Sequence, residues 1–169
     1  MDDSEIEHKV WEIVRTWLEG ATPGQWHRFA ARSNYDDNGR ALRWLLDNRN
    51  IDHATALLIY WNLGAAWFVQ YANESDLGDA SYQLDRFRLA REVERRYADG
   101  YYADHGIWFD PYDFEGAGPN DYPDVPVVRP VPALMLQPTS GREYVDLDEE
   151  GYDEGLPFDV VDRISALYD

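Results

Sequence analysis

The sequence predicts a mainly α fold: a compact multi-helix domain with a loop-rich, weakly β C-terminal half and a final helix. Apolar residues recur at helical spacing through the first hundred residues, and capping patterns precede several of these runs. Most of the 9 prolines lie after Gly100. We therefore expect a single domain over residues 1–169, with a helical core region at 1–99, an acidic Pro/Gly-rich extended region at 100–156 and a C-terminal helix at 157–169.

Local signals predict the first three helices. Residues 4–7, Ser-Glu-Ile-Glu, have the spacing of a capping box and are expected to start a helix that ends near Gly20. Residues 22–25, Thr-Pro-Gly-Gln, are a second capping signal with proline at the first helical position. The polar cluster at 34–39 predicts a turn, and the third helix should run from about Arg40 to Asn48.

The central part of the chain predicts a buried helix and then a polar one. Asp52 can cap a helix that is apolar nearly all round through Trp61, so this helix belongs in the core. Gly64 should end or kink it. A long polar helix is expected from Asp79 to Gly100. After it, the short apolar segments at residues 107–109, 125–131, 134–136 and 144–145 are broken by prolines and predict strands or extended edges, so this half should be irregular with a small sheet. The final helix should begin at 156–159 and pack on the bundle.

The negative charge is concentrated in the second half. The net charge is −18, from 15 Lys+Arg and 33 Asp+Glu. Residues 1–99 hold 12 basic and 17 acidic residues, and residues 100–169 hold 3 and 16, so the two parts carry −5 and −13. Such a surface repels nucleic acid and anionic membranes and attracts basic partners. The arginines between Arg86 and Arg96 are expected in internal ion pairs such as Glu92–Arg96.

Several kinds of chemistry find no support in the sequence. There is no cysteine, no apolar run of membrane-spanning length, no Gly-x-Ser-x-Gly elbow and no phosphate-binding glycine motif. The four histidines, His8, His27, His53 and His105, have no paired-ligand spacing. We therefore expect no catalytic residues, cofactor or metal site. The acidic N-terminal residues do not look like a secretory signal, which favours a cytoplasmic location.

Aromatic residues interleaved with carboxylates predict a partner-binding surface in the second half, because aromatic side chains are common interface anchors. The predicted partner-binding residues are Tyr101, Tyr102, Trp108, Asp110, Asp113, Glu115, Asp121, Asp124, Asp146, Asp148, Glu149 and Glu150. This pattern favours an acidic binding protein with a basic protein partner. Within that class we expect an immunity protein that neutralises a bacterial toxin by protein–protein contact.

Two other classes remain open. A carboxylate-based metal-dependent enzyme or calcium-binding module would use Asp36 and Asp37 with His27, or the loop 146–150. That loop resembles the start of an EF-hand, with oxygen ligands at its first, third and fifth positions, but Pro157 stands where the bidentate glutamate is required. The chain could also be a scaffold that pairs with itself.

Residues 26–61 resemble the bacterial domain-of-unknown-function family 4274. The resemblance rests on Asn34-Tyr35-Asp36-Asp37-Asn38-Gly39, on Leu42-x-Trp44-Leu45-Leu46-x-Asn48, and on Asp52-x-x-Thr55-Ala56-Leu57-x-Ile59-Tyr60-Trp61. The proline usual after the last segment is replaced by Gly64-Ala65. The resemblance implies a bacterial source and no assigned activity. We expect the polar residues of these motifs to form the turn and the helix caps.

Overall fold

The computed structural model describes residues 1–169, and it confirms a mainly α fold. The α-helices are α1 (Asp3–Gly20), α2 (Pro23–Arg32), α3 (Gly39–Asp47), α4 (His53–Asn62), α5 (Ala65–Phe68), α6 (Leu84–Ala98) and α7 (Phe158–Ser165). Two 3₁₀ segments, η1 (Glu74–Gln83) and η2 (Ala133–Leu136), and one antiparallel hairpin of β1 (Tyr152–Asp153) and β2 (Leu156–Pro157) complete it.

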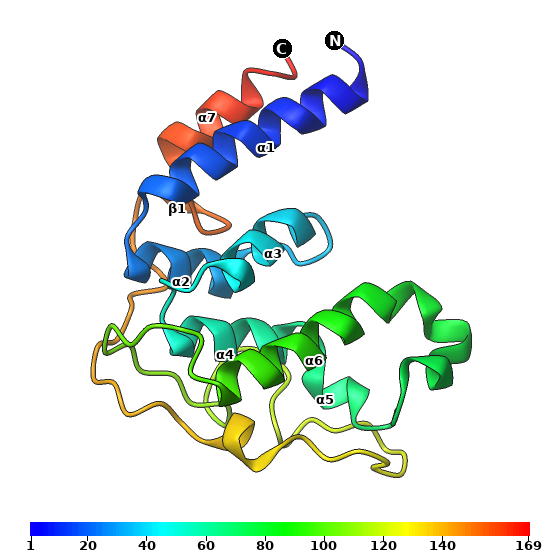
Figure 1. Cartoon of the computed structure of the whole chain (residues 1–169). Helices are drawn as coiled ribbons and strands as arrows, with labels where there is room; N and C mark the ends of the chain where they lie inside the picture. Colours follow the sequence, from blue (N-terminus) through cyan, green and yellow to red (C-terminus); the bar gives the residue numbers. More distant parts are fainter.

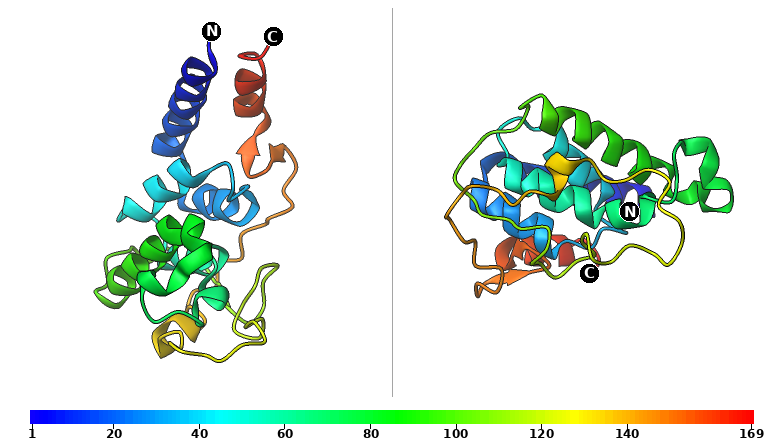
Figure 2. Two further views of the ribbon diagram at one scale, coloured as in Figure 1. Left: turned by 90° about the vertical axis from the view of Figure 1, so that its right-hand side faces the viewer. Right: turned by 90° about the horizontal axis from the view of Figure 1, so that it is seen from below.

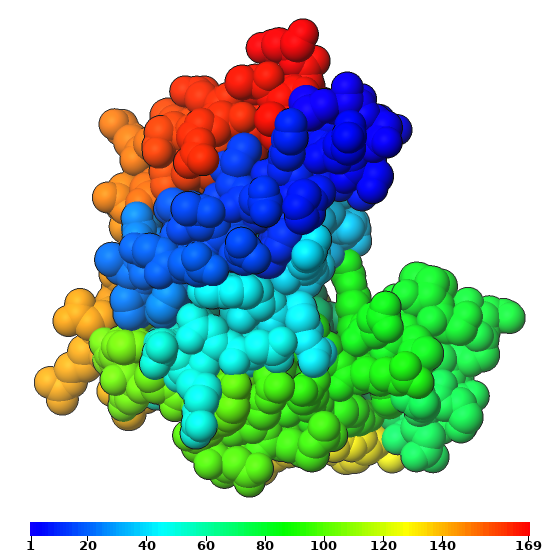
Figure 3. Space-filling view, turned by 45° about the horizontal axis from the view of Figure 1, so that its top comes forward, coloured from blue at the N-terminus to red at the C-terminus, as the bar shows by residue number.

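The helices stack in three tiers (Figure 1). Helices α1 and α7 lie side by side at one end, α2 and α3 form the middle, and α4, α5 and α6 form the other end, where the loops of the second half run across them. Both termini lie at the α1/α7 end, as Figure 1 and the left view of Figure 2 show. A lobe formed by η1 and the adjoining start of α6 projects sideways (Figure 3). The expected docking of the final helix is therefore confirmed, with α1 as its neighbour.

Helix α4 is the centre of the core, as its apolar sequence predicts. Every residue from 54 to 61 is buried, and the helix packs against α2 and α6. A helix that is apolar all round is stable only when neighbours cover all its faces. The indole Nε1 of Trp61 donates a hydrogen bond to the carbonyl oxygen of Met135, at 3.0 Å, so this helix also anchors the loop region.

Three of the predicted helix caps and ends are confirmed, and the cap of a fourth helix lies at a different residue. Thr22 and Gln25 form the capping box of α2, Asp52 accepts from the Ala54 N–H at the start of α4, and Gly64 adopts a φ of 112° where α4 ends. At α1 the cap is Asp2 instead of Ser4. The first residues offer two overlapping capping boxes, and the structure uses the earlier one, which adds a half-turn to the helix.

Two other predictions are corrected. The helix expected from Asp79 begins at Leu84, because residues up to Gln83 belong to the 3₁₀ segment η1, whose backbone is non-helical at Gly78 (φ 51°) and at Ala80 (φ −89°, ψ 20°). The predicted strand segments form no sheet: Ile107 makes one isolated bridge to Glu143, residues 133–136 form η2, and the only paired strands are β1 and β2. Apolar side chains of these segments insert singly into the core, and their prolines lack the N–H that a ladder needs.

Candidate functional site

A cavity of about 480 Å³ lies between α2, α4 and two loops of the second half. Its volume falls within the ~300–1,000 Å³ usual for small-ligand sites. Four aromatic residues, Trp108, Phe109, Phe114 and Tyr144, form much of its wall, and His27 and Arg32 reach it from α2. We call this cavity the aromatic pocket.

Backbone hydrogen bonds between the loop at 106–108 and the loop at 143–144 hold the aromatic wall in place. The Trp108 N–H donates to the carbonyl oxygen of Glu143, at 2.9 Å, and the Glu143 N–H donates to that of Gly106, at 2.8 Å. This pairing stacks Trp108 on Tyr144, with ring centroids 4.8 Å apart and planes 28° from parallel. The wall is therefore held by backbone hydrogen bonds from both loops, as well as by side-chain packing.

Glycine at position 116 allows the chain to close around the wall. A Cβ atom there would lie 2.3 Å from Phe114 Cε2 and 2.5 Å from Asn62 Oδ1. These separations are far below van der Waals contact, so any larger residue would displace the aromatic ring or the Asn62 side chain. The position of Phe114 in the pocket thus depends on this glycine.

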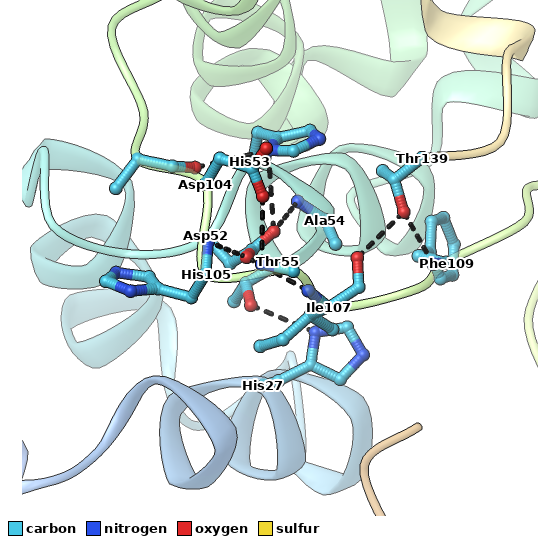
Figure 4. Close-up of polar contacts among 12 residues, drawn as sticks. His27, Asp52, His53, Ala54, Thr55, Asp104, His105, Ile107, Phe109 and Thr139 are labelled. Atoms are coloured by element: carbon cyan, nitrogen blue, oxygen red, sulfur yellow. Dashed lines mark hydrogen bonds and ion pairs between the residues drawn. The ribbon is translucent and has the colours of Figure 1, made fainter. Parts of the chain in front are cut away.

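His27 forms the buried end of the aromatic pocket. Its side chain is buried in α2, and Nδ1 lies 2.9 Å from the hydroxyl oxygen of Thr55 on α4 (Figure 4). Burial lowers the pKa of His27 to about 4, so the ring is neutral at physiological pH. Thr55 is fully buried and its hydroxyl makes no other hydrogen bond. We assign the hydroxyl as the donor to Nδ1, because otherwise its O–H would be buried without an acceptor, and this tautomer carries the ring proton on Nε2.

The neutral state of His27 makes stability depend on pH. The unfolded chain protonates this histidine near 6.5 and the folded chain only near 4, so its contribution is fully present above 6.5 and declines as pH falls through this window. We expect a loss of about 3 kcal/mol in the free energy of unfolding between pH 7 and 4 from this group.

Urea unfolding across this pH range, on the wild type and on His27→Gln, measures that loss. The variant should show a flatter profile than the wild type between pH 6.5 and 5, where few carboxylates titrate. His8→Gln is the control, since His8 is exposed on α1. Identical slopes in the wild type and the His27 variant would contradict a neutral, buried ring.

Two arginines of α2 gather acidic residues beside the pocket. Arg32 donates to Glu115, at 2.5 Å, and to Asp148, at 2.8 Å, and these bonds raise the pKa of its guanidinium. Arg28 pairs with Glu149, and its guanidinium lies 4.3 Å from the ring centroid of Tyr152. Three of the predicted partner-binding carboxylates thus attach the 146–150 loop and the 115 loop to α2.

The other predicted partner-binding residues divide into three groups. Tyr101 and Tyr102 donate their hydroxyl protons to the carbonyl oxygens of Asp47, at 2.6 Å, and Leu46, at 2.8 Å, so they attach the chain after α6 to α3. Tyr102 is only 8% exposed and offers little surface to a partner. Trp108 lines the aromatic pocket. The carboxylates that make no ion pair within the chain are Asp110, Asp113, Asp121, Asp124, Asp146 and Glu150.

The carboxylate clusters considered as metal sites do not converge. Asp36 pairs with Arg86 at 2.9 Å, Asp37 accepts from Asn34 at 2.8 Å, and His27 faces Thr55. The loop 146–150 brings no three carboxylates together, and the one group of three potential ligands in the chain is Asp52, His53 and Asp104. Neither predicted carboxylate site is therefore assembled as a metal centre.

In this group, the carboxylate of Asp52 accepts hydrogen bonds from the backbone. The Asp52 carboxylate is completely buried and accepts from three N–H groups: Ala54 at 2.7 Å, His105 at 2.6 Å and Ile107 at 3.3 Å (Figure 4). With both oxygens so occupied, Asp52 joins the start of α4 to the loop that leads to the aromatic pocket. The sequence identified Asp52 as a cap, and its long-range bonds had no sequence signal.

These features define a small α-helical domain in which a central buried helix and a capping aspartate position an aromatic pocket bordered by carboxylates. Residues 21–98 match the protein family described as "Domain of unknown function (DUF4274)". The predicted family is thus confirmed for this segment, which extends beyond residues 26–61 on both sides and contains α2 to α6. Comparison with curated proteins and with solved structures found no match. No helix combines the length and the apolar character needed to cross a bilayer.

Proposed function

We propose that this chain is a bacterial, cytoplasmic binding protein whose acidic second half docks a basic protein partner. Within that class, we propose an immunity protein that neutralises a toxin by covering its active site or substrate groove. The docking surface consists of the exposed carboxylates of the loops at 110–124 and 146–150, with Trp108 and Tyr144 between them.

The observation that carries this proposal is the unequal use of charge within the chain. The arginines of α6 are mostly engaged internally: Arg86 with Asp36, Arg88 with Glu74, and Arg96 with Asp47 and Glu92. Arg129, one of 3 basic residues in the second half, pairs with Glu94 of α6. The carboxylates of the two loops that make no ion pair therefore keep a negative potential, which attracts basic proteins and speeds their association at low salt.

Coexpression with the products of adjacent genes tests the proposal directly. A toxin partner should have a basic domain, should form a one-to-one complex with this chain and should lose its toxicity when the chain is present. Its association rate should fall steeply with added salt, since exposed charges are screened over a Debye length of ~8 Å at physiological ionic strength. Absence of any protected toxin, or an association rate unaffected by salt, would contradict the proposal.

Neutralising variants locate the docking surface. Asp113, Asp124 and Glu150 make no side-chain hydrogen bond or ion pair, so Asp113→Asn, Asp124→Asn and Glu150→Gln change charge with little effect on the fold. The triple variant should slow association by about tenfold at low salt. A matched triple at Glu7, Asp79 and Asp99, which are exposed on other elements, should associate as the wild type does.

A further inference from the structure

We infer that the aromatic pocket binds a planar, amino-substituted nitrogen heterocycle of the size of a free nucleobase or nucleoside. This inference goes beyond the proposed function and does not rest on it, because it concerns a small molecule held inside the fold. Three features of the pocket carry it: the aromatic wall, one unpartnered donor at the buried end, and carboxylates at the mouth.

The wall selects a flat ring. Phe109 and Phe114 meet edge to face, with centroids 5.1 Å apart, and Trp108, which precedes Phe109 in the chain, also lines the pocket. Leu58 and Val145 complete the apolar lining. Stacking and edge contacts with such residues favour a planar aromatic ligand over an aliphatic one of equal volume.

The buried end selects a hydrogen-bond acceptor on that ring. His27 is 5% exposed, and its Nε2–H has no partner in the chain. Figure 4 shows Nδ1 toward Thr55 and Nε2 on the opposite side of the ring. Gln83 carries the only fully enclosed side-chain atom without a partner, so His27 Nε2 remains open to the pocket that it lines. A ring nitrogen or carbonyl oxygen would satisfy this donor.

The mouth selects amino groups and disfavours phosphate. Asp113 and Glu115 line the pocket, and Arg32, the one cation there, is already bonded to Glu115 and Asp148. Carboxylates accept hydrogen bonds from an exocyclic amino group and repel an anion. The site therefore fits a heterocycle that is neutral or cationic, and a nucleoside rather than a nucleotide.

Calorimetric titration of the full chain at pH 7 with adenine, purine, adenosine and AMP tests the assignment. Adenine and adenosine should bind, whereas purine, which lacks the amino group, and AMP, which carries phosphate, should each bind about tenfold more weakly. Adenine should also shift the His27 Nε2–H resonance in an NMR spectrum. Absence of both heat and shift at millimolar adenine, or equal affinity for AMP and adenosine, would overturn the assignment.

Two variants separate binding in the aromatic pocket from binding elsewhere. Ala31→Leu fills the pocket from α2 without removing a contact, and it should abolish adenine binding. Trp108→Ala removes one wall and should weaken binding about tenfold, the effect typical of a lost base–aromatic stack. Trp67→Ala is the control, because Trp67 is 44% exposed and lies outside the pocket. Thermal melts of each variant verify folding, and unchanged affinity in a folded Ala31→Leu protein would refute the inference.

Discussion

Replacing Asp52 with alanine is expected to lower the free energy of unfolding by about 3–5 kcal/mol. The carboxylate is completely buried and accepts from the backbone of Ala54, His105 and Ile107. Alanine leaves these three backbone N–H groups without their acceptor, and each buried orphan donor costs about 1–3 kcal/mol. Urea unfolding monitored by tryptophan fluorescence measures the change.

Two further variants give this prediction its controls. Asp52→Asn keeps one acceptor oxygen but points an amide N–H at a backbone donor, so its loss should lie between those of alanine and the wild type. Asp79→Ala removes an exposed aspartate and should leave stability unchanged within about 0.5 kcal/mol. In Asp52→Ala, amide hydrogen exchange should quicken at Ile107, which lies far from position 52 in sequence. A wild-type exchange rate there would show that the loop does not depend on Asp52.

Asp52 makes one local hydrogen bond and two long-range ones, and only the local bond could be predicted from the sequence. The cap of α4 is local, since donor and acceptor are two residues apart, and a capping pattern reveals it. The bonds to residues 105 and 107 span more than fifty residues, and no pattern within a short window encodes them. Helix positions in residues 1–99 were predicted for the same reason, and the loop arrangement after Gly100 was not.

The residues of the aromatic pocket also divide into those that local sequence predicted and those that only the packing of the chain reveals. Trp108, Asp113 and Glu115 were predicted as binding residues from their mixed aromatic and acidic neighbourhood, and all three line the cavity. His27 appeared in the sequence as a residue near Asp36 and Asp37. Its actual partner, Thr55, lies two helices further along the chain, on the buried helix α4. Periodicity places both residues on helices, but only the packing of α2 against α4 brings the two side chains together.

A second buried carboxylate, Glu94 of α6, ties the loop at 125–131 to the helical core. It is 7% exposed and receives the Tyr60 hydroxyl proton at 2.6 Å. Arg129 donates to both of its oxygens, at 2.8 and 2.6 Å, while Arg91 lies 3.4 Å away. Burial lowers the pKa of the Arg91 guanidinium, and burial raises that of the Tyr60 hydroxyl. The buried carboxylate of Glu94 therefore neutralises charge from the guanidiniums of Arg91 and Arg129 and accepts the hydrogen bond of the Tyr60 hydroxyl.

Glu94→Ala is accordingly expected to destabilise the protein by about 3–5 kcal/mol, because it leaves two partly buried guanidiniums facing each other and a buried hydroxyl without an acceptor. The loop should also loosen, because its only remaining hydrogen bonds to the helical core would be those from the Val128 and Arg129 N–H groups to the Val69 carbonyl oxygen. Limited proteolysis should then cut near residues 125–130 faster than in the wild type, and a thermal melt should record the loss of stability.

Two controls separate the charge from the packing of Glu94. Glu94→Gln keeps an acceptor for Tyr60 but removes the negative charge, so it should restore part of the stability and little of the protection from protease. Arg88→Ala breaks the exposed pair with Glu74, which solvent screens, and should change neither measurement. If Glu94→Ala melted and resisted protease like the Arg88 variant, the carboxylate would be a surface charge in solution and the loop would owe its position to the buried side chains of Val131 and Met135.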